Sequence, residues 1–481
     1  MNTNPALQDY LSLSPMAILL LSGLVLIVIE SLSPKFSRKS AFPIAFLSII
    51  AALISSYLAP EPTHPYISAF IVSDSPAQFF TSFFLVVGAV IALISASFFK
   101  QRTESHGEYA FLLLSSLIGL ILIGASADFL TLFLGLEILS LALYVLVAYM
   151  KTWSKTHEAA IKFFLLGSMA TAFLIFGVAL IYGATGTTRF EGLLEKYGAL
   201  TDAPSRVLFI SGSALFALGL LFKAAVVPFH FWAPDVYAGA ATPVTAFLAV
   251  GSKAGAFAGL ARVFLITIPG FDPVFSTMIA LAAAITLLYG NILAIRQRAF
   301  RRFFAYSGIS HSGFMLIAIA AAGEGGAFEA LAFYLTVYSV ATLGVFSLFT
   351  AMDAGDGDIP FESVQGLFKR SPWIALAFAL SLLVLAGFPP FVGFFAKFIL
   401  FKVAYTKGLI WLMVLALILT VISSYYYFRL VLLLFKGAVD QVRIRPECSL
   451  SFAFACLAGV LLLILSLSPD RLTTLIGAIK P

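Results

Sequence analysis

The chain has 481 residues, of which 61% are apolar and only 11% charged, with a formal net charge of +6. Soluble globular domains carry about 25% charged residues and about 45 to 50% apolar ones, so the composition excludes a soluble enzyme, a disordered chain and a disulfide-stapled secreted module. It also argues against an outer-membrane barrel, whose strands alternate polar and apolar residues in short segments. What is left is a helical membrane protein.

Fourteen apolar runs, each long enough to cross a bilayer as a helix, are bounded by charges or by proline and glycine. They predict an all-α polytopic membrane protein with about fourteen transmembrane helices and little chain outside the membrane. No Lys or Arg precedes the first run, so we expect a mature helix there rather than a signal peptide. The runs lie near residues 15–32, 41–59, 76–99, 109–127, 129–150, 158–183, 206–227, 242–265, 273–294, 302–321, 328–350, 371–404, 409–435 and 449–468.

Basic residues in the connecting loops predict the orientation of the helices. The loops that lead from odd-numbered to even-numbered runs hold sixteen Lys and Arg, whereas the opposite loops and the chain ends hold six. Cytoplasmic loops retain basic residues, so both termini are expected on the non-cytoplasmic side. The same bias explains the positive net charge, and no nucleic-acid role is inferred from it.

Four ionisable residues lie where the membrane makes a charge costly. Glu137 is in the fifth run, Lys223 late in the seventh, Lys253 in the middle of the eighth and Lys397 in the twelfth. A charge near the bilayer midplane costs about 2.5 to 3.5 kcal/mol on insertion scales, and such a residue is a functional candidate. Any one of them could be a snorkelling or structurally paired side chain. Four together favour a path for a proton or another ion.

Prolines predict that two of these runs are broken helices. Pro228 removes the amide that would bond the carbonyl of Ala224, and Pro390 does the same to the carbonyl of Ala386. Interrupted helices mark ion sites in transporters, although a plain proline kink is the alternative at each place. The two broken runs are five apart, which is an odd number, so a five-helix unit must recur with the opposite orientation.

The organisation that follows is two inverted five-helix repeats, runs 4–8 and runs 9–13, with runs 7 and 12 broken. We therefore expect N-terminal helices 1–3 over residues 1–105, a first repeat over 106–270, a second repeat over 271–437 and a last helix over 438–481.

Three further polar residues are weaker candidates. His311 lies in the middle of the tenth run, and a histidine, whose ordinary pKa is near neutrality, suits a proton shuttle, but a hydrogen-bonded structural histidine fits equally well. His230 follows the first predicted break and could be a gate, a helix cap or an interfacial anchor. Lys162, near the start of the sixth run, could snorkel to the interface or lie close to Glu137.

Lysine suits proton transfer because its proton affinity responds both to burial and to a nearby carboxylate. If Glu137 lies near Lys223, the two form a switch that holds and releases a proton, which further lysines and a histidine can pass on. The sequence has no nucleotide, flavin or P-loop motif. Its two cysteines, Cys448 and Cys456, have no neighbouring histidine for a zinc or iron–sulfur site.

Four segments resemble a known family. FKAAVVPFHFWAPDVYAGAATPVTAFLAVGSKAGAF, at 222–257, closely resembles the signature of the N-type subunits of bacterial proton-pumping NADH:quinone oxidoreductase, respiratory complex I. The segments LGLEILSLALYVL, RRFFAYSGISHSGF and LAGFPPFVGFFAKF agree with it. The L and M subunits and Mrp-type sodium/proton antiporter subunits share this antiporter-like plan. The absence of a long C-terminal lateral helix and the presence of Lys397, where M types carry glutamate, favour the N type.

The resemblance implies roles for the charged residues. Glu137 and Lys223 would form the glutamate–lysine pair of the first half, Lys253 would be the central relay lysine, and Lys397 the terminal lysine of the second half. His311 occupies a matching polar position.

The resemblance also implies the setting. The chain would be a proton-translocating subunit of an enzyme complex in the bacterial cytoplasmic (inner) membrane, driven by redox energy from other subunits. NADH, FMN, iron–sulfur clusters and quinone would bind those subunits, which leaves no cofactor or metal here. Its partners would be the neighbouring M subunit, small membrane subunits, the lateral helix of the L subunit, and lipid. Two alternatives are an Mrp-type Na+/H+ antiporter subunit and a structural scaffold whose buried charges merely pair.

Overall fold

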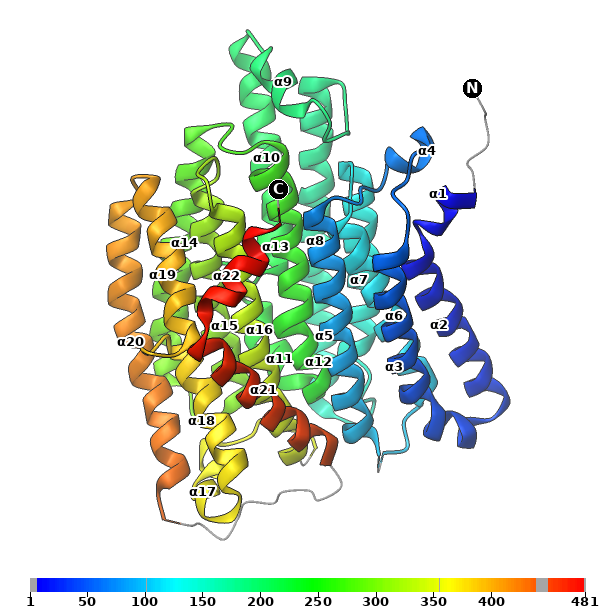
Figure 1. Ribbon diagram of the computed structural model, residues 1–481, viewed down its shortest axis with the longest axis vertical. Helices are drawn as coiled ribbons and strands as arrows, with labels where there is room; N and C mark the ends of the chain where they lie inside the picture. Colours follow the sequence, from blue (N-terminus) through cyan, green and yellow to red (C-terminus); the bar gives the residue numbers. More distant parts are fainter. Residues whose placement is uncertain (1–6, 101, 354, 438–448, 480–481) are drawn as a thin grey trace.

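The computed structural model describes residues 7–100, 102–353, 355–437 and 449–479, and these ranges contain helices and no extended strand. Thirteen helices within the described ranges are long and apolar enough to cross a membrane. A further crossing consists of two shorter helices in succession, α18 (Pro372–Ala386) and α19 (Val392–Thr406). The crossing helices lie side by side in one bundle (Figure 1), which confirms the predicted fold class.

The first half of the bundle holds eight crossings. They are α2 (Ser14–Leu32), α3 (Pro34–Leu58), α5 (Ser75–Phe99), α6 (His106–Gly124), α7 (Phe129–Val147), α8 (Ser154–Thr185), α10 (Ala203–Lys223) and the segment Thr242–Thr267. The short helices between them are α1 (Leu7–Leu11), α4 (Pro65–Ser68), α9 (Leu193–Gly198) and α11 (Trp232–Gly239).

The second half holds the remaining crossings. Besides α18 and α19 they are α14 (Pro273–Arg296), α15 (Phe300–Ala320), α16 (Ala327–Met352), α20 (Ile410–Phe435) and α21 (Ser449–Leu467). The short helices are a 3-10 turn at Phe361–Val364, α17 (Leu367–Arg370) and α22 (Pro469–Gly477).

Polar residues that interrupt the apolar runs start many of the helices. A side-chain oxygen there accepts a hydrogen bond from a free backbone amide of the first turn, which is the role of an N-cap. Five crossing helices begin behind such a cap, namely Asp74 before α5, Ser105 before α6, Asp128 before α7, Asp202 before α10 and Asp272 before α14. The same residues that bound the apolar runs in the sequence thus also fix the helix starts.

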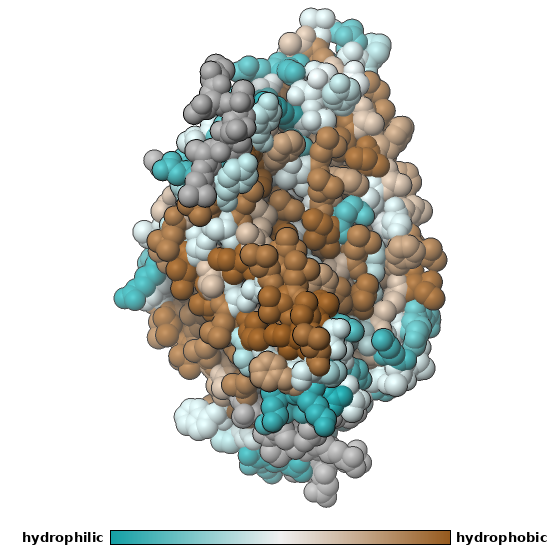
Figure 2. All heavy atoms as spheres, turned by 90° about the vertical axis from the view of Figure 1, so that its right-hand side faces the viewer, coloured by the Kyte–Doolittle hydropathy of each residue, from teal (hydrophilic) through white to brown (hydrophobic). Residues whose placement is uncertain are grey.

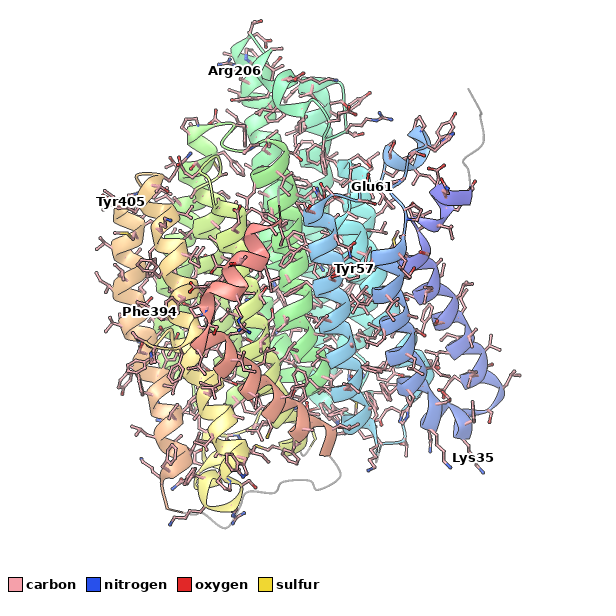
Figure 3. The ribbon with its side chains drawn as sticks, viewed as in Figure 1. Lys35, Tyr57, Glu61, Arg206, Phe394 and Tyr405 are labelled. Atoms are coloured by element: carbon pink, nitrogen blue, oxygen red, sulfur yellow. The ribbon has the colours of Figure 1, made fainter. Side chains whose placement is uncertain are left out.

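The second crossing begins earlier than predicted. Its expected start near residue 41 is wrong, because α3 begins at Pro34 and includes Lys35, Arg38 and Lys39. Proline is favourable in the first turn of a helix, where its missing amide has no partner to lose. The long basic side chains let the helix extend beyond its apolar part, and Lys35 lies at the opposite end of the bundle from Arg206 (Figure 3).

Both predicted helix breaks are present. The seventh crossing stops at Lys223, Ala225 has the positive φ of 56°, and helix resumes only at Trp232. The twelfth crossing stops at Ala386, turns at Gly387 with φ 75° and resumes at Val392. The breaks therefore fall five crossings apart, as the inverted-repeat argument requires, while the four domain boundaries stay predictions.

The eighth crossing, Thr242–Thr267, is irregular along its length. A π-helical segment at Leu248–Ser252 precedes α13 (Lys253–Leu260), and a second one follows it. A Cβ added at Gly259 would lie 3.1 Å from a methyl of Leu220 on α10, so small residues let α10 approach closely on that side. Lys253 points toward α15, where its Nζ donates to Ser312.

The outer face of the bundle is apolar in its middle. Figure 2 shows a band of hydrophobic residues across the α2 and α3 side, with hydrophilic residues gathered toward both ends. Exposed leucine, valine and isoleucine side chains of these two helices form part of this band, among them Leu21, Val25, Leu47 and Ile54. An apolar belt between polar ends is the surface of a protein embedded in a bilayer.

Candidate functional site

Three lysines predicted as relay groups are buried inside the bundle. The exposed fraction is 4% for Lys223, 2% for Lys253 and 3% for Lys397. Among the residues that the structure describes, none of the three ammonium groups has a carboxylate oxygen within 4.0 Å. These lysines are therefore not members of structural ion pairs. A charge that is buried without a counter-charge is costly.

Lys223 ends α10 at the first helix break. Its Nζ lies 5.1 Å from the ring centroid of Tyr144 and 5.0 Å from that of Phe163. Aromatic faces attract a cation. Within the described part of the chain Nζ of Lys223 has no hydrogen-bond partner, so these two rings are its neighbouring groups. The lysine therefore sits in an aromatic slot between α7 and α8.

Glu137 is half-buried on α7 and accepts a hydrogen bond of 2.9 Å from the hydroxyl of Thr171 on α8. The predicted pair with Lys223 is therefore not a direct ion pair in this structure. Tyr144, two helical turns along from Glu137, presents the ring that faces Lys223. Both members of the predicted switch are thus held by the same two helices, α7 and α8, without touching each other.

Lys253 lies at the centre of the molecule, where the two halves meet. Its Nζ donates hydrogen bonds to the carbonyl of Gly308 and, at 2.9 Å, to the hydroxyl of Ser312. The same group lies 5.7 Å from the ring centroid of Tyr338. Ser312 in turn donates to the carbonyl of Ala224 at 2.6 Å. The carbonyl that Pro228 leaves free at the first break is therefore bonded to α15 and not to Lys223.

Lys397 follows the second break, on α19. Its Nζ donates to the carbonyl of Ala386 at 2.9 Å and reaches Ser423 on α20 at 3.5 Å. It also lies 4.5 Å from the ring centroid of Phe314. Ala386 is the residue whose carbonyl Pro390 leaves without an amide, so at this break the freed acceptor and the lysine do meet.

His311 lies between the central and terminal lysines. Its Nδ1 is 2.8 Å from the hydroxyl of Tyr334 and its Nε2 is 3.0 Å from that of Tyr427. A cavity of about 10 Å³ is lined by both His311 and Lys397. A volume of about 10 to 15 Å³ holds one water, and the histidine and the lysine both contribute polar groups to its lining.

The remaining candidates lie apart from this series. His230 is 2% exposed, its Nδ1 has no hydrogen-bond partner in the described part of the chain, and its ring lies 4.3 Å from that of Tyr289. Lys162 does not contact Glu137, since it pairs with Glu158 at 2.5 Å and with Asp235 at 2.6 Å. Its side chain is 40% exposed, as expected of a lysine that snorkels to the interface.

Two buried arginines escaped the sequence reasoning. Arg262 pairs with Asp74 at 2.5 Å and donates to the carbonyl of Gly124. Arg301, counted among the loop cations, is fully buried and pairs with Asp353 at 2.7 Å. The signal for Arg262 was its position inside an apolar run, whereas the partner of each arginine is far along the chain.

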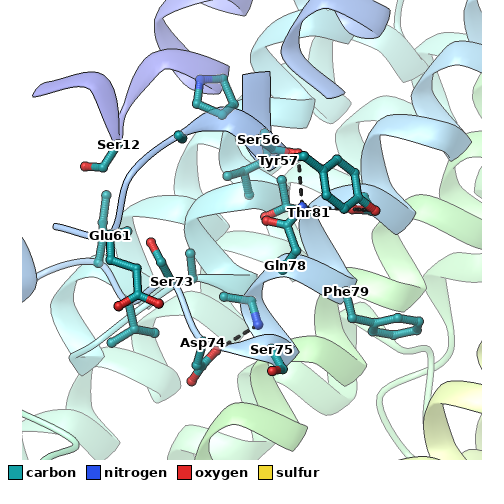
Figure 4. Close-up of a pocket in the computed structure, with 18 of the residues that line it drawn as sticks. Ser12, Ser56, Tyr57, Glu61, Ser73, Asp74, Ser75, Gln78, Phe79 and Thr81 are labelled. Atoms are coloured by element: carbon teal, nitrogen blue, oxygen red, sulfur yellow. Dashed lines mark hydrogen bonds between the residues drawn. The ribbon is translucent and has the colours of Figure 1, made fainter. Parts of the chain in front are cut away.

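Asp74 also borders an open recess of about 540 Å³ with both polar and apolar walls (Figure 4). The recess is lined by hydroxyl, amide and carboxylate side chains, including Ser12, Glu61 and Gln78, and by Ile479 near the other end of the chain. In Figure 4 the Asp74 carboxylate caps α5, and Gln78 bonds Ser56 at 3.2 Å. The segments near both termini therefore lie at the same end of the bundle.

Over the described ranges no group of three or more His, Cys, Asp or Glu is arranged to hold a metal ion. Cys456 is a free thiol, and Cys448 lies outside the described residues.

Comparison with known proteins identifies the family. The sequence model described as NADH:quinone oxidoreductase/Mrp antiporter, TM, matches residues 126–423. NADH-quinone oxidoreductase subunit N of Protochlamydia amoebophila is 45% identical over 92% of this chain and 92% of its own length. A chain of respiratory complex I from Thermus thermophilus has 34% identity and a TM-score of 0.81, with 96% of this chain and 98% of that chain covered. A chain of the Mrp complex from Dietzia is 22% identical with a TM-score of 0.81, over 98% of this chain and 96% of that chain, and shares the fold.

The matches over most of the chain define an antiporter-like membrane subunit. The chain belongs to the NADH:quinone oxidoreductase/Mrp antiporter family and, within it, to the subunit N group of NADH:quinone oxidoreductase. The resemblance predicted from four sequence segments is thereby confirmed. The Mrp-type alternative corresponds to a more distant relative.

Proposed function

We propose that this chain translocates protons in NADH:quinone oxidoreductase through Glu137, Lys223, Lys253, His311 and Lys397. The observation that carries the proposal is the set of three buried lysines, each less than 5% exposed, with no carboxylate in contact in the described part of the chain. A lysine in such a place can exist without its proton, whereas an arginine stays charged. Groups that change charge inside a membrane without a fixed counter-charge suit proton transfer.

The order of the relay follows from the contacts. Lys223 lies at the first break, and the next residue, Ala224, is bonded through Ser312 to Lys253. His311 precedes Ser312 on α15 and faces the small cavity that ends at Lys397. A proton can therefore pass along the membrane from the first half to the second. Glu137 acts on Lys223 from a distance, as a carboxylate whose position changes the proton affinity of the lysine.

The proposal includes the surroundings of the chain. Redox energy comes from other subunits, which hold NADH, FMN, the iron–sulfur clusters and quinone. The partners are the neighbouring M subunit, small membrane subunits and the lateral helix of the L subunit. The membrane is the bacterial cytoplasmic membrane, with both termini on the non-cytoplasmic side. Support for this topology comes from the recess that Ser12 and Ile479 both line, at the end of the bundle opposite to basic Lys35.

His230 and Lys162 have lesser roles in this proposal. The carboxylate of Asp235 forms ion pairs with Lys162 at 2.6 Å and with Arg302 at 3.2 Å. Asp235, at the centre of this exposed charge cluster, lies five residues beyond the buried His230, which is at the first break. We assign the cluster to the entry of protons from the solvent, with His230 as the first buried group inside it.

The scaffold alternative makes an opposite prediction about the lysines. Buried charges that serve structure are paired with opposite charges, as Arg301 and Arg262 are, and none of the three lysines is. The Mrp-type alternative differs in its complex and in the transported cation.

The test is proton pumping coupled to NADH:quinone turnover in membranes that carry Lys223→Met or Lys253→Met. Lys196→Met is the matched control, because Lys196 is exposed on α9 outside the bundle. A native gel first establishes that the complex assembles. We expect pumping to be lost in the two buried variants and retained in the control. Normal pumping in an assembled Lys223→Met complex would contradict the proposed relay. Absence of the chain from any NADH-oxidising complex would favour the Mrp-type alternative.

A further inference from the structure

Ser312 joins the first helix break to the central lysine. Its hydroxyl, which is fully buried, donates 2.6 Å to the carbonyl of Ala224 and accepts 2.9 Å from Nζ of Lys253. Its own helix offers a poorer acceptor, the carbonyl of Gly308 at 3.2 Å. Serines in membrane helices commonly bond back to their own helix. Ser312 instead connects three crossings, the seventh, eighth and tenth.

The direction of this hydrogen bond depends on the protonation of Lys253. An ammonium group has three N–H donors and no acceptor, so the Ser312 oxygen must accept from it and the hydroxyl proton is directed to Ala224. A neutral amine has a lone pair. It can then accept the hydroxyl proton of Ser312, and the carbonyl of Ala224 loses its donor.

The carbonyl concerned lies at the break itself. Ala224 follows Lys223 directly, and its normal helical donor would be residue 228, which is proline. Its neighbour Ala225 has a φ of 56°, a left-handed conformation that is unfavourable for a residue other than glycine. A buried carbonyl that loses its donor is destabilised, and in the described part of the chain Ser312 is the donor to the Ala224 carbonyl, so this bond helps to hold the break in its present form.

We propose that Ser312 is a positioning residue, which transmits the protonation state of Lys253 to the helix break beside Lys223. This inference rests on the proposed relay and deepens it, because it gives the two lysines a mechanical connection besides electrostatic repulsion. Protonated Lys253 holds the break closed on α15. Loss of that proton releases the Ala224 carbonyl and lets the end of α10, with Lys223, move.

The titratable groups that face this site are few. Tyr338 of α16 places its ring near Lys253, His311 precedes Ser312 on α15, and Lys223 precedes Ala224 on α10. No carboxylate lies within 4.0 Å of Lys253 in the described ranges. We therefore expect a substitution at Ser312 to change the pH profile chiefly through its effect on Lys253.

The experiment compares Ser312→Ala and Ser312→Cys in the complete complex. Ser347→Ala is the matched control, because Ser347 is also fully buried but bonds the carbonyl of Leu343 in its own helix at 2.7 Å. For Ser312→Ala we expect coupled turnover and pumping to fall about five- to tenfold, the size of one buried hydrogen bond. The alkaline limb of the pH profile should also move to lower pH, because the ammonium form of Lys253 loses an acceptor.

The cysteine variant keeps the volume of the side chain but is a weak donor and acceptor, so an intermediate fall with the same direction of pH shift is expected. A serine that merely fills space would give an unchanged pH profile in both variants. Wild-type rate and pH profile in Ser312→Ala, while Lys253→Met abolishes pumping, would overturn the role of Ser312 alone. Normal pumping in Lys253→Met would instead overturn the relay itself.

Discussion

Two kinds of buried cation occupy different regions of this bundle. Arg262 and Arg301 lie toward the helix ends, and each has a carboxylate partner within 2.7 Å. Lys223, Lys253 and Lys397 lie in the interior with carbonyls, hydroxyls and aromatic rings around them. Arginine keeps its charge at any physiological pH and needs a counter-charge, whereas lysine can lose its proton. In the proposed relay, the difference separates fixed charges that hold helices together from charges that move with a proton.

Of the two arginine sites, the Arg301 site has the more extensive contacts. Arg301 and Asp353 are 0% and 1% exposed, and the guanidinium also donates to the carbonyls of Ala238 and Ala240. Thr242 donates to the same carboxylate at 2.6 Å. The site therefore ties the start of the eighth crossing to the facing ends of α15 and α16.

The largest effect on stability is expected from Arg301→Met. The change leaves the Asp353 carboxylate buried without a partner, and breaking a buried pair costs about 3 to 5 kcal/mol. We expect the complex to fail assembly on a native gel, or to melt at a clearly lower temperature when purified. The double variant Arg301→Met/Asp353→Leu removes both charges and should recover most of the stability. A stable single variant would show that the pair does not hold the helices.

A smaller loss is expected from Arg262→Met. Its partner Asp74 is 40% exposed, so water can solvate the carboxylate once the guanidinium is gone. We expect a loss of about 1 to 3 kcal/mol, mostly from the Gly124 carbonyl that loses its donor. Melting of the purified complex measures it, with Asp74→Asn as the control that keeps the α5 cap. A loss of stability as large as that of Arg301→Met would contradict the expectation that the more exposed ion pair contributes less.

The contrast also marks what the sequence could predict. Apolar runs define the crossings because bilayer thickness sets helix length, and prolines define the breaks because they remove an amide. Charges inside apolar runs identified Glu137 and the three lysines. These are properties of single residues or of short segments, which can be read without knowing which helices are neighbours.

The partners of the charges could not be predicted in the same way. Arg262 meets Asp74, which is 188 residues away, and Arg301 meets Asp353 across 52 residues. Ser312 looks like any serine in a membrane helix until the break of α10 is brought beside it. Such pairings depend on the packing of helices that are distant in sequence, and a single sequence with no alignment does not determine them.

A third prediction compares the two lysines at the breaks. Lys397 donates to the carbonyl that Pro390 leaves free, whereas Lys223 has no hydrogen bond in the described part of the chain. Both methionine variants should lose pumping. Only Lys397→Met should also lose stability, by about 1 kcal/mol or somewhat more, because the Ala386 carbonyl becomes unpaired. Lys223→Met should melt at or above the temperature of the unsubstituted complex. Equal destabilisation in both would mean that Lys223 has a polar partner in the assembled complex.

The smallest effect concerns an exposed carboxylate, Asp356, in the loop after α16. The backbone amide and the hydroxyl of Ser154 both bond it at 2.9 Å and lower its pKa. A carboxyl group with a lowered folded-state pKa adds stability above its unfolded pKa, and this is lost as the pH falls through the folded value. Between about pH 5 and 8, where native carboxylates stay ionised, Ser154→Ala lacks the hydroxyl hydrogen bond to Asp356 and should therefore melt slightly below the unsubstituted protein.

In strongly acidic buffer this difference should disappear, because the carboxyl group is then protonated in both proteins. The difference above about pH 5 should itself be small, because exposed charges are screened by water and salt. Melting curves recorded from about pH 3 to about pH 8, which span the titration of carboxyl groups, measure the variant in both pH ranges. A large change near neutrality in Ser154→Ala would mean that the loop contact supports the Arg301–Asp353 site three residues away. The distinction between exposed and buried carboxylates would then have to be replaced by one coupled network at this end of the bundle.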